Sequence, residues 1–144
     1  MGLAREYGCK VILDFGCGKG ILRPAVRAIA KDLKILEFDP AIPGKETLPD
    51  RRPHMVLARD VMEHIEPDCL DAVLETISGL RPKVVVLAVS LVPANQILPD
   101  GRNAHLILET ADWWRQKLGQ YFTTFKENES KDHLLFIGAP IVPA

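Results

Sequence analysis

The chain has 144 residues, of which 47% are hydrophobic and 26% charged, a composition typical of one globular domain spanning residues 1–144. Its 18 basic and 19 acidic side chains give a net charge of -1, so it lacks the basic excess expected of a nucleic-acid-binding protein. No apolar run reaches the roughly 20 residues that a membrane-spanning helix needs. We therefore expect a cytoplasmic protein with neither a nucleic-acid nor a membrane partner.

Cysteines and histidines give no metal-binding or disulfide pattern. Cys9, Cys17 and Cys69 form an odd set without a C-x-x-C pair, which fits neither a disulfide framework nor a zinc site. No two histidines stand at ligand spacing, and the Glu63-His64 pair is not part of an H-E-x-x-H motif. The sequence therefore predicts reduced thiols and no bound metal.

The first part of the chain alternates between strand and helix patterns. Apolar residues first form a short continuous run, as in a buried strand, and then recur at helical spacing. The predicted elements are a strand at 10–15, a helix at 21–33, a strand at 34–38 and a strand at 54–59. The segment between the last two is rich in proline and glycine and too short for a full helix, a strand and two turns. We expect a shortened region where a further strand would otherwise lie.

The second part continues the alternation and closes with a hairpin. Its predicted elements are a helix at 68–80, a strand at 83–89, a helix at 110–118 and two strands at 122–126 and 133–137. Alternating strands and helices are typical of a doubly wound, mostly parallel α/β sheet, and the hairpin adds an antiparallel last strand.

Three glycines stand where the first strand ends. Gly16, Gly18 and Gly20 form a G-x-G-x-G turn, whereas the dinucleotide pattern G-x-G-x-x-G would need a glycine at Ile21. No Lys-Ser or Lys-Thr pair follows, so the turn is not a phosphate-binding P-loop. Because ligands of open α/β sheets lie beyond the carboxyl ends of the strands, the turn is either a tight bend or a place where a ligand approaches the main chain.

Two carboxylates narrow the choice of ligand. Asp14 lies in the first strand, where it would attract a cation, and Asp39 follows the second strand, where an acid can bind a ribose diol. A ligand with an ammonium or sulfonium group at one end and a ribose in the middle would suit both. S-adenosylmethionine has that arrangement.

The motifs "VILDFGCGKG", "ILEFDP" and "DVMEHIEP" occur in this order. Together they resemble the class I S-adenosylmethionine-dependent methyltransferases of the small-molecule type, in an unusually short version. The resemblance implies S-adenosylmethionine as cofactor and S-adenosylhomocysteine as product. It also implies three groups of cofactor-binding residues, each in or next to one motif: Asp14, Gly16, Cys17, Gly18 and Gly20; Phe38, Asp39 and Pro40; and Arg59, Asp60 and Val61.

A long polar loop follows the predicted strand at 83–89, and in this fold it would overhang the methyl donor. His105 in this loop is a candidate general base, and His64 in the third motif is a second one. Each histidine could instead be a structural residue that packs or orients a loop. The candidate substrate-binding residues are Asn95, Arg102, Asn103 and Trp113.

We therefore expect an enzyme that methylates an oxygen or nitrogen atom of a small molecule. Two alternatives stay open at this point. The chain could be a catalytically silent cofactor-binding module that needs a partner or a second copy to close an open site. It could also catalyse a different reaction that consumes S-adenosylmethionine.

Overall fold

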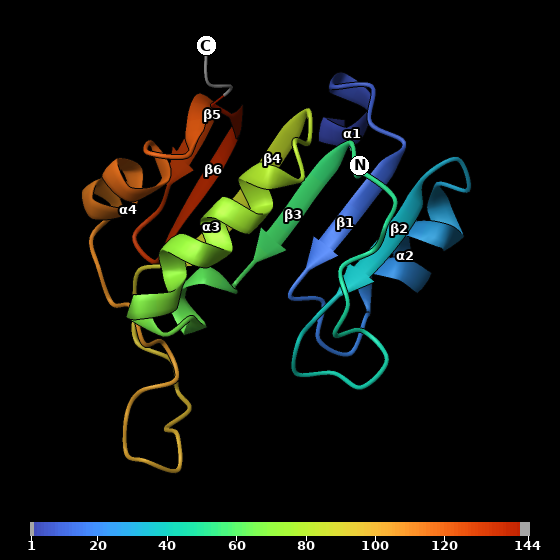
Figure 1. Cartoon of the computed structure of the whole chain (residues 1–144). Coiled ribbons are helices and arrows are strands. Elements are labelled where there is room, and N and C mark those ends of the chain that lie inside the picture. Colours follow the sequence, from blue (N-terminus) through green and yellow to red (C-terminus); the bar gives the residue numbers. More distant parts are fainter. Residues whose placement is uncertain (1, 142–144) are drawn as a thin grey trace.

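The computed structural model describes residues 2–141, and within this range the chain forms a six-stranded sheet in the order β2-β1-β3-β4-β6-β5 (Figure 1). The strands are β1 (Val11–Phe15), β2 (Lys34–Phe38), β3 (Met55–Arg59), β4 (Val84–Ser90), β5 (Phe122–Glu129) and β6 (His133–Pro140). Strands β1 to β4 pair in parallel, and β6 runs antiparallel to β4 and β5. The predicted α/β sheet with an antiparallel last strand is confirmed.

Helices cover both faces of this sheet. They are α1 (Gly2–Glu6), α2 (Leu22–Ile29), α3 (Leu70–Gly79) and α4 (Ala111–Leu118), with 3-10 turns at Met62–His64 and Pro67–Cys69. In Figure 1, α3 and α4 lie in front of the sheet and α2 lies behind it. No helix within residues 2–141 is long and apolar enough to cross a membrane.

Each face has its own apolar core, and β1 contributes to both. Leu13 and Phe15 join the core on the α3 and α4 side, whereas Ile12 packs with Val26 of α2 on the other side. Because successive strand residues point to opposite faces, Asp14 lies on the same side as Ile12. Its carboxylate therefore belongs to the α2 side of the sheet's carboxyl edge.

Several predicted boundaries differ from the structure, and the largest differences, at the end of α2 and in the closing strands, have identifiable reasons. The helix expected at 21–33 ends at Ile29, because Ala30 takes a non-helical backbone conformation (φ -148°, ψ 81°) before the chain turns into β2. The closing strands are longer than predicted, since β5 continues through polar residues to Glu129. Pairing with β6 satisfies that backbone and outweighs the polar composition.

The segment between β2 and β3 departs most from a regular alternation. Residues 39–54 are all described, and they contain turns and bends but no helix or strand. Leu48 of this segment packs against the core that holds α3 and α4. The expected shortened region is therefore an irregular loop, and it lies beside the carboxyl ends of β1 and β2 (Figure 1).

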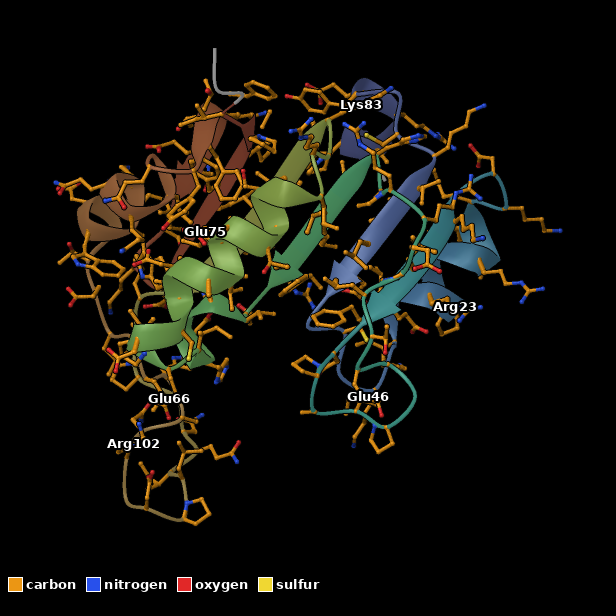
Figure 2. All side chains as sticks on the ribbon, viewed as in Figure 1. Arg23, Glu46, Glu66, Glu75, Lys83 and Arg102 are labelled. Atoms are coloured by element: carbon orange, nitrogen blue, oxygen red, sulfur yellow. The ribbon has the colours of Figure 1, made fainter. Side chains whose placement is uncertain are left out.

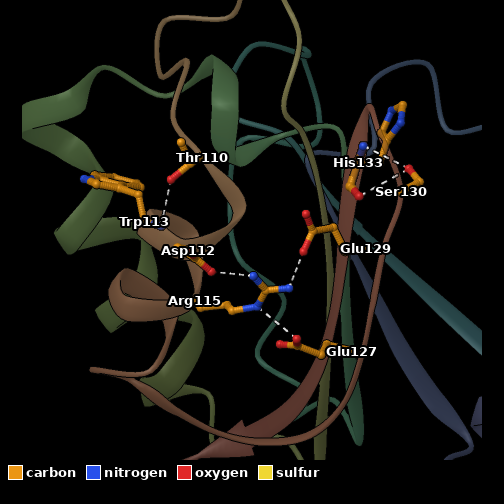
Figure 3. Close-up of polar contacts among 8 residues, drawn as sticks. All are labelled: Thr110, Asp112, Trp113, Arg115, Glu127, Glu129, Ser130 and His133. Atoms are coloured by element: carbon orange, nitrogen blue, oxygen red, sulfur yellow. Dashed lines mark hydrogen bonds and ion pairs between the residues drawn. The ribbon is translucent and has the colours of Figure 1, made fainter.

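Helix α4 is fixed to the edge strand β5 by one arginine. The Arg115 guanidinium lies 2.7 Å from Asp112, 2.9 Å from Glu127 and 2.5 Å from Glu129 (Figure 3). These three carboxylates raise the pKa of Arg115. The Thr110 hydroxyl caps the same helix by accepting a hydrogen bond from the Trp113 amide at 3.2 Å.

Candidate active site

The glycine turn after β1 is bound to the end of β2. The Phe38 carbonyl accepts hydrogen bonds from the amides of Gly16 at 2.8 Å and Cys17 at 3.1 Å. Gly16, Gly18 and Gly20 have φ values of +74°, +51° and +76°, in the left-handed region. Another residue would be strained there by roughly 1–2 kcal/mol, so the turn itself requires glycine.

The three glycines differ in what surrounds them. A Cβ added to Gly16 would lie 2.6 Å from a methyl carbon of Val61, and one added to Gly20 would overlap the side-chain ends of Glu37 and Lys45. A Cβ on Gly18 would have no other group within 4 Å. Gly16 and Gly20 therefore let other protein groups come close, whereas the main chain at Gly18 borders open space.

Asp39 joins the end of β2 to this turn. Its Oδ2 accepts a hydrogen bond from the Gly18 amide at 2.8 Å, and its Oδ1 accepts one from the Ala41 amide at 2.9 Å. Each carboxylate oxygen has a second lone pair, so Asp39 can still accept hydrogen bonds from a ligand. Lys45 reaches the same turn, with its Nζ 3.3 Å from the Gly18 carbonyl oxygen.

Asp14 borders a cavity of about 380 Å³ between β1, the glycine turn and the start of α2. Burial raises the pKa of Asp14, and the negative charge of Glu37 raises it further. Arg59 lines the same cavity and offsets part of this effect.

Burial also raises the pKa of Cys17, so its thiol is protonated at neutral pH and poorly suited to be a nucleophile.

A second, mostly apolar cavity of about 440 Å³ lies on the α3 side of the turn. It shares Gly16 with the first cavity. The residues around it come from the ends of β1, β2 and β3 and from α3: Phe15, Gly16, Phe38, Asp39, Pro40, Ala41, Asp60, Val61, His64, Ile65, Val73 and Thr76. The two cavities together extend from the Asp14 carboxylate to a slot with an aromatic and aliphatic lining.

The chain bends sharply after β3. Asp60 has a φ of 55°, and its amide donates to the Ala88 carbonyl at 2.9 Å, which fixes the bend against β4. The Asp60 carboxylate lies 3.7 Å from Arg59 Nε and 3.9 Å from His133 Nε2. Val61 follows and contacts Gly16, so the ends of β1 and β3 meet at the cavity.

The two candidate bases meet beside this cavity. The rings of His64 and His105 have their centroids 4.7 Å apart, at an interplanar angle of 82°. His64 Nδ1 lies 2.8 Å from the Ala104 carbonyl oxygen, and His105 Nδ1 lies 2.6 Å from that of Val92. A carbonyl can only accept a hydrogen bond, so in the neutral rings the proton is on Nδ1 and Nε2 carries the lone pair.

The loop between β4 and α4 is held in shape by its polar side chains. The Asn103 carboxamide exchanges hydrogen bonds with the Ala94 backbone at 3.0 and 2.8 Å and accepts one from the His105 amide at 2.9 Å. Arg102 lies beside Glu66 (Figure 2) and forms a bidentate pair with it at 2.8 and 2.9 Å. Arg102 also contacts Asp100 at 2.8 Å. Both side chains are engaged within the protein, whereas Asn95 is exposed.

The tryptophan pair divides between two environments. Trp114 is fully buried in the core, whereas Trp113 is half-buried. Trp113 lines a separate cavity of about 340 Å³ beside Lys117 and Leu106. The structure thus brings together the glycine turn, Asp39, Asp60 and the two histidines, but it does not bring Trp113 or Arg102 into the cavity that His64 lines.

The fold resembles those of solved methyltransferases. The chain superposes on the Burkholderia thailandensis 1,6-didemethyltoxoflavin-N1-methyltransferase, bound to its substrate and S-adenosylhomocysteine, with a TM-score of 0.63 and 16% identity over 96% of this chain and 74% of that one. It also matches human N-acetylserotonin methyltransferase in complex with SAM, with a TM-score of 0.61 and 13% identity over 93% of this chain and 48% of that one. The chain has the class I methyltransferase fold. No protein-family model matches the sequence, and no curated protein matches it.

In this class I methyltransferase fold, two residues at the site were not expected from the sequence. Glu63 is fully buried although its side chain is ionisable, and its Oε1 accepts a hydrogen bond from the Ser90 amide at 2.8 Å. Its position beside His64 in the third motif was the available signal. Lys45 gave no signal, because the sequence does not reveal that the loop after β2 folds back on the glycine turn.

Proposed function

We propose that this protein transfers a methyl group from S-adenosylmethionine to an oxygen or nitrogen atom of a small acceptor, releasing S-adenosylhomocysteine. The observation that carries the proposal is the pair of cavities that share Gly16, at the carboxyl edge of a class I methyltransferase sheet. The solved structures named above contain S-adenosylhomocysteine or SAM, which supports the same cofactor here.

The residues around the two cavities fit that cofactor. Asp14 provides a half-buried carboxylate for an amino-acid ammonium group, and the open space at Gly18 lets a ligand contact the main chain. Asp39 would accept hydrogen bonds from the ribose hydroxyls. Phe38 and Val61 line the apolar cavity, which suits a flat purine base.

When bound, S-adenosylmethionine would supply a methyl carbon activated by a positively charged sulfur. The remaining task of the chain is to position the acceptor and to remove its proton. His64 lines the larger of the two cavities, and the His105 ring packs edge to face against the His64 ring. In each neutral ring, Nε2 is free to accept a proton. Asn95 is the exposed candidate for an acceptor contact, whereas Arg102 and Asn103 would act by shaping the loop that carries His105.

Turnover with a mixed pool of small metabolites tests this proposal. The purified protein and S-adenosylmethionine should yield S-adenosylhomocysteine together with one pool component that is heavier by a methyl group. Mass spectrometry with a methyl-labelled cofactor would identify that component. Cofactor consumption that yields any other product would contradict methyl transfer and favour a different reaction of the same cofactor.

A second function deserves a test because residues 39–54 form a loop without helix or strand, all within the described range. The apolar cavity is lined by Pro40 and Ala41 of this region and by Val73 and Thr76 of α3. A partner or second copy that covers this side would make the chain a cofactor-binding module. Tight binding of S-adenosylhomocysteine without turnover of any acceptor, restored by a partner, would favour this alternative.

A further inference from the structure

The Glu63 side chain has one carboxylate oxygen without a partner. It is fully buried, and its Oε1 accepts the Ser90 amide hydrogen at 2.8 Å, but among the described residues no group donates to Oε2. An unpaired oxygen on a buried carboxylate is strongly unfavourable unless a proton or a cation compensates its charge.

Two imidazoles lie close to the Glu63 carboxylate. One ligand atom from each of Glu63, His64 and His105 lies within 4.8 Å of the other two. The Nδ1 atoms of both rings are directed at backbone carbonyls, at 2.8 and 2.6 Å, which leaves Nε2 as the free nitrogen. Histidines that bind metals usually donate their other nitrogen in this way, because the hydrogen bond fixes both the tautomer and the ring orientation.

We propose that Glu63, His64 and His105 bind a first-row divalent metal ion, of which Zn²⁺ is representative. Two imidazole nitrogens and one carboxylate oxygen form a donor set that suits zinc and its neighbours better than calcium or magnesium. The ion would pair with Glu63 Oε2 and so satisfy the buried oxygen. The Asp60 carboxylate, close enough to influence Glu63, adds to the negative potential at this point.

Three protein ligands leave a tetrahedral site with one open position. His64 lines the apolar cavity in which the cofactor's base would lie, so the open position would border the bound cofactor. A hydroxyl bound to the ion would lose its proton to solvent near neutral pH, because a metal ion strongly lowers the pKa of a bound oxygen acid. This role rests on the proposed methyl transfer, and it favours an acceptor that presents a hydroxyl group. With the ion bound, His64 and His105 act as ligands and no longer as bases, so the ion replaces them in promoting loss of the acceptor's proton. The metal site itself does not depend on this role.

The sequence alone predicts no bound metal, because no two histidines stand at ligand spacing. That expectation considers only residues close together in the chain. The 3-10 turn Met62–His64 supplies two of the ligands, and the loop before α4 supplies the third. The Asn103 carboxamide holds that loop by accepting a hydrogen bond from the His105 amide, so the three side chains are already close together without an ion.

Titration of the metal-free protein tests the site without cofactor or acceptor. After treatment with a chelator, the protein is titrated with CoCl₂, whose visible absorption reports tetrahedral coordination, and with ZnCl₂ by calorimetry. We expect one equivalent of either ion to bind and the thermal unfolding midpoint to rise. A wild-type protein that binds neither ion would overturn the proposal.

Variants assign the ligands. Glu63→Gln and His105→Ala should each weaken Zn²⁺ binding by at least about tenfold and reduce the cobalt absorption. His133→Asn and Cys69→Ala remove an exposed imidazole and an exposed thiol outside the cluster and should leave both signals unchanged. Zn²⁺ binding that is equally tight in wild type, Glu63→Gln and His105→Ala would refute the site.

Two further measurements keep the test decisive. Glu63→Gln alters a buried group and could fail to fold, but His105 is half-buried on a loop, so His105→Ala remains a valid test. Binding of S-adenosylhomocysteine to the metal-free protein is measured separately. If the metal-free protein does not bind S-adenosylhomocysteine, the proposed function is contradicted but the metal site is not. If the protein does not bind zinc, the metal site is refuted but the cofactor proposal is not.

Discussion

The imidazole rings of His64 and His105 meet edge to face, with centroids 4.7 Å apart, although one follows β3 and the other precedes α4. Each ring is oriented by a carbonyl from another part of the chain: Ala104 for His64 and Val92 for His105. The pair therefore depends on the loop between β4 and α4. Changes in that loop should affect the site even where they touch no ligand.

Replacing Gly18 by alanine should block the cofactor more than it destabilises the fold. Gly18 has a φ of +51° and no group within 4 Å of an added Cβ. The backbone strain should lower the free energy of unfolding by roughly 1–2 kcal/mol. The new methyl group would occupy space next to the bound ligand, so affinity for S-adenosylhomocysteine should fall by about tenfold or more, as measured by calorimetry.

Gly8 provides the matched control for this substitution. It has a φ of +60° and equally open surroundings, but it lies beside α1, away from the glycine turn. Gly8→Ala should lower stability by a similar amount and leave cofactor affinity unchanged. Equal affinity in the two variants would contradict the role assigned to Gly18.

Gly16→Ala should destabilise the protein more than Gly18→Ala does. A Cβ at position 16 would lie 2.6 and 2.8 Å from the two methyl carbons of Val61, a short side chain that has little freedom to move away. Overpacking of this kind adds about 1–3 kcal/mol to the backbone strain. Denaturant unfolding measures the difference. A double-mutant cycle with Val61→Ala should recover part of the loss, and full additivity of the two changes would contradict a direct contact.

Much of this architecture could be predicted from the sequence because its signals are local. The apolar runs of β1 and β4, the helical spacing after residue 70 and the glycine turn each indicated an element in its correct place. The end of α2 and the extension of β5 could not be predicted in the same way. They depend on where the chain must enter the next strand and on pairing with β6.

The site was less accessible to sequence reasoning. Asp39 and the glycines were identified as a set, and the structure brings Asp39 to within 2.8 Å of the Gly18 amide. The structural role of Arg102 cannot be predicted from the sequence, because the sequence does not indicate that a charged loop residue forms an ion pair with Glu66. The grouping of Glu63 with His105 likewise arises only when separate loops converge.

Asn103→Ala should loosen the loop that presents His105. The Asn103 side chain makes three hydrogen bonds to the backbone of this loop, at 2.8 to 3.0 Å. Their loss should cost about 1–2 kcal/mol of unfolding free energy and broaden the His105 imidazole resonances in an NMR spectrum. Asn95→Ala, at an exposed position of the same loop, should change stability by less than about 0.5 kcal/mol. Equal stability of the two variants would count against the bracing role of Asn103.

The tryptophan pair should respond very differently to truncation. Trp114 is fully buried, so Trp114→Ala should cost about 3–5 kcal/mol. Trp113 is half-buried and lies with its ring 5.8 Å from Lys117 Nζ, so Trp113→Ala should cost markedly less. Urea unfolding monitored by circular dichroism compares them directly. Similar losses in the two variants would contradict the placement of Trp114 in the core and Trp113 at its edge.

Asp14 should make stability and cofactor binding respond to pH in opposite directions. The pKa of Asp14 is raised mainly by burial and next by the negative charge of Glu37, and the opposing charges of Arg59 and Lys45 offset only part of this effect. The folded protein therefore retains the proton at pH values where the unfolded chain has released it. Stability due to Asp14 is then fully present below the ordinary aspartate pKa and is lost as the pH rises through the raised value.

Asp14→Asn mimics the protonated form at every pH. The variant should be more stable than wild type at neutral pH, and the difference should vanish as the pH falls below the ordinary aspartate pKa, because both side chains are then neutral. At neutral pH the same variant should bind S-adenosylhomocysteine more weakly, since it lacks the charge that would hold the ligand's ammonium group. Unfolding curves at several pH values and calorimetry give the two readouts. A variant that gains stability but keeps full affinity would show that this carboxylate does not contact the cofactor.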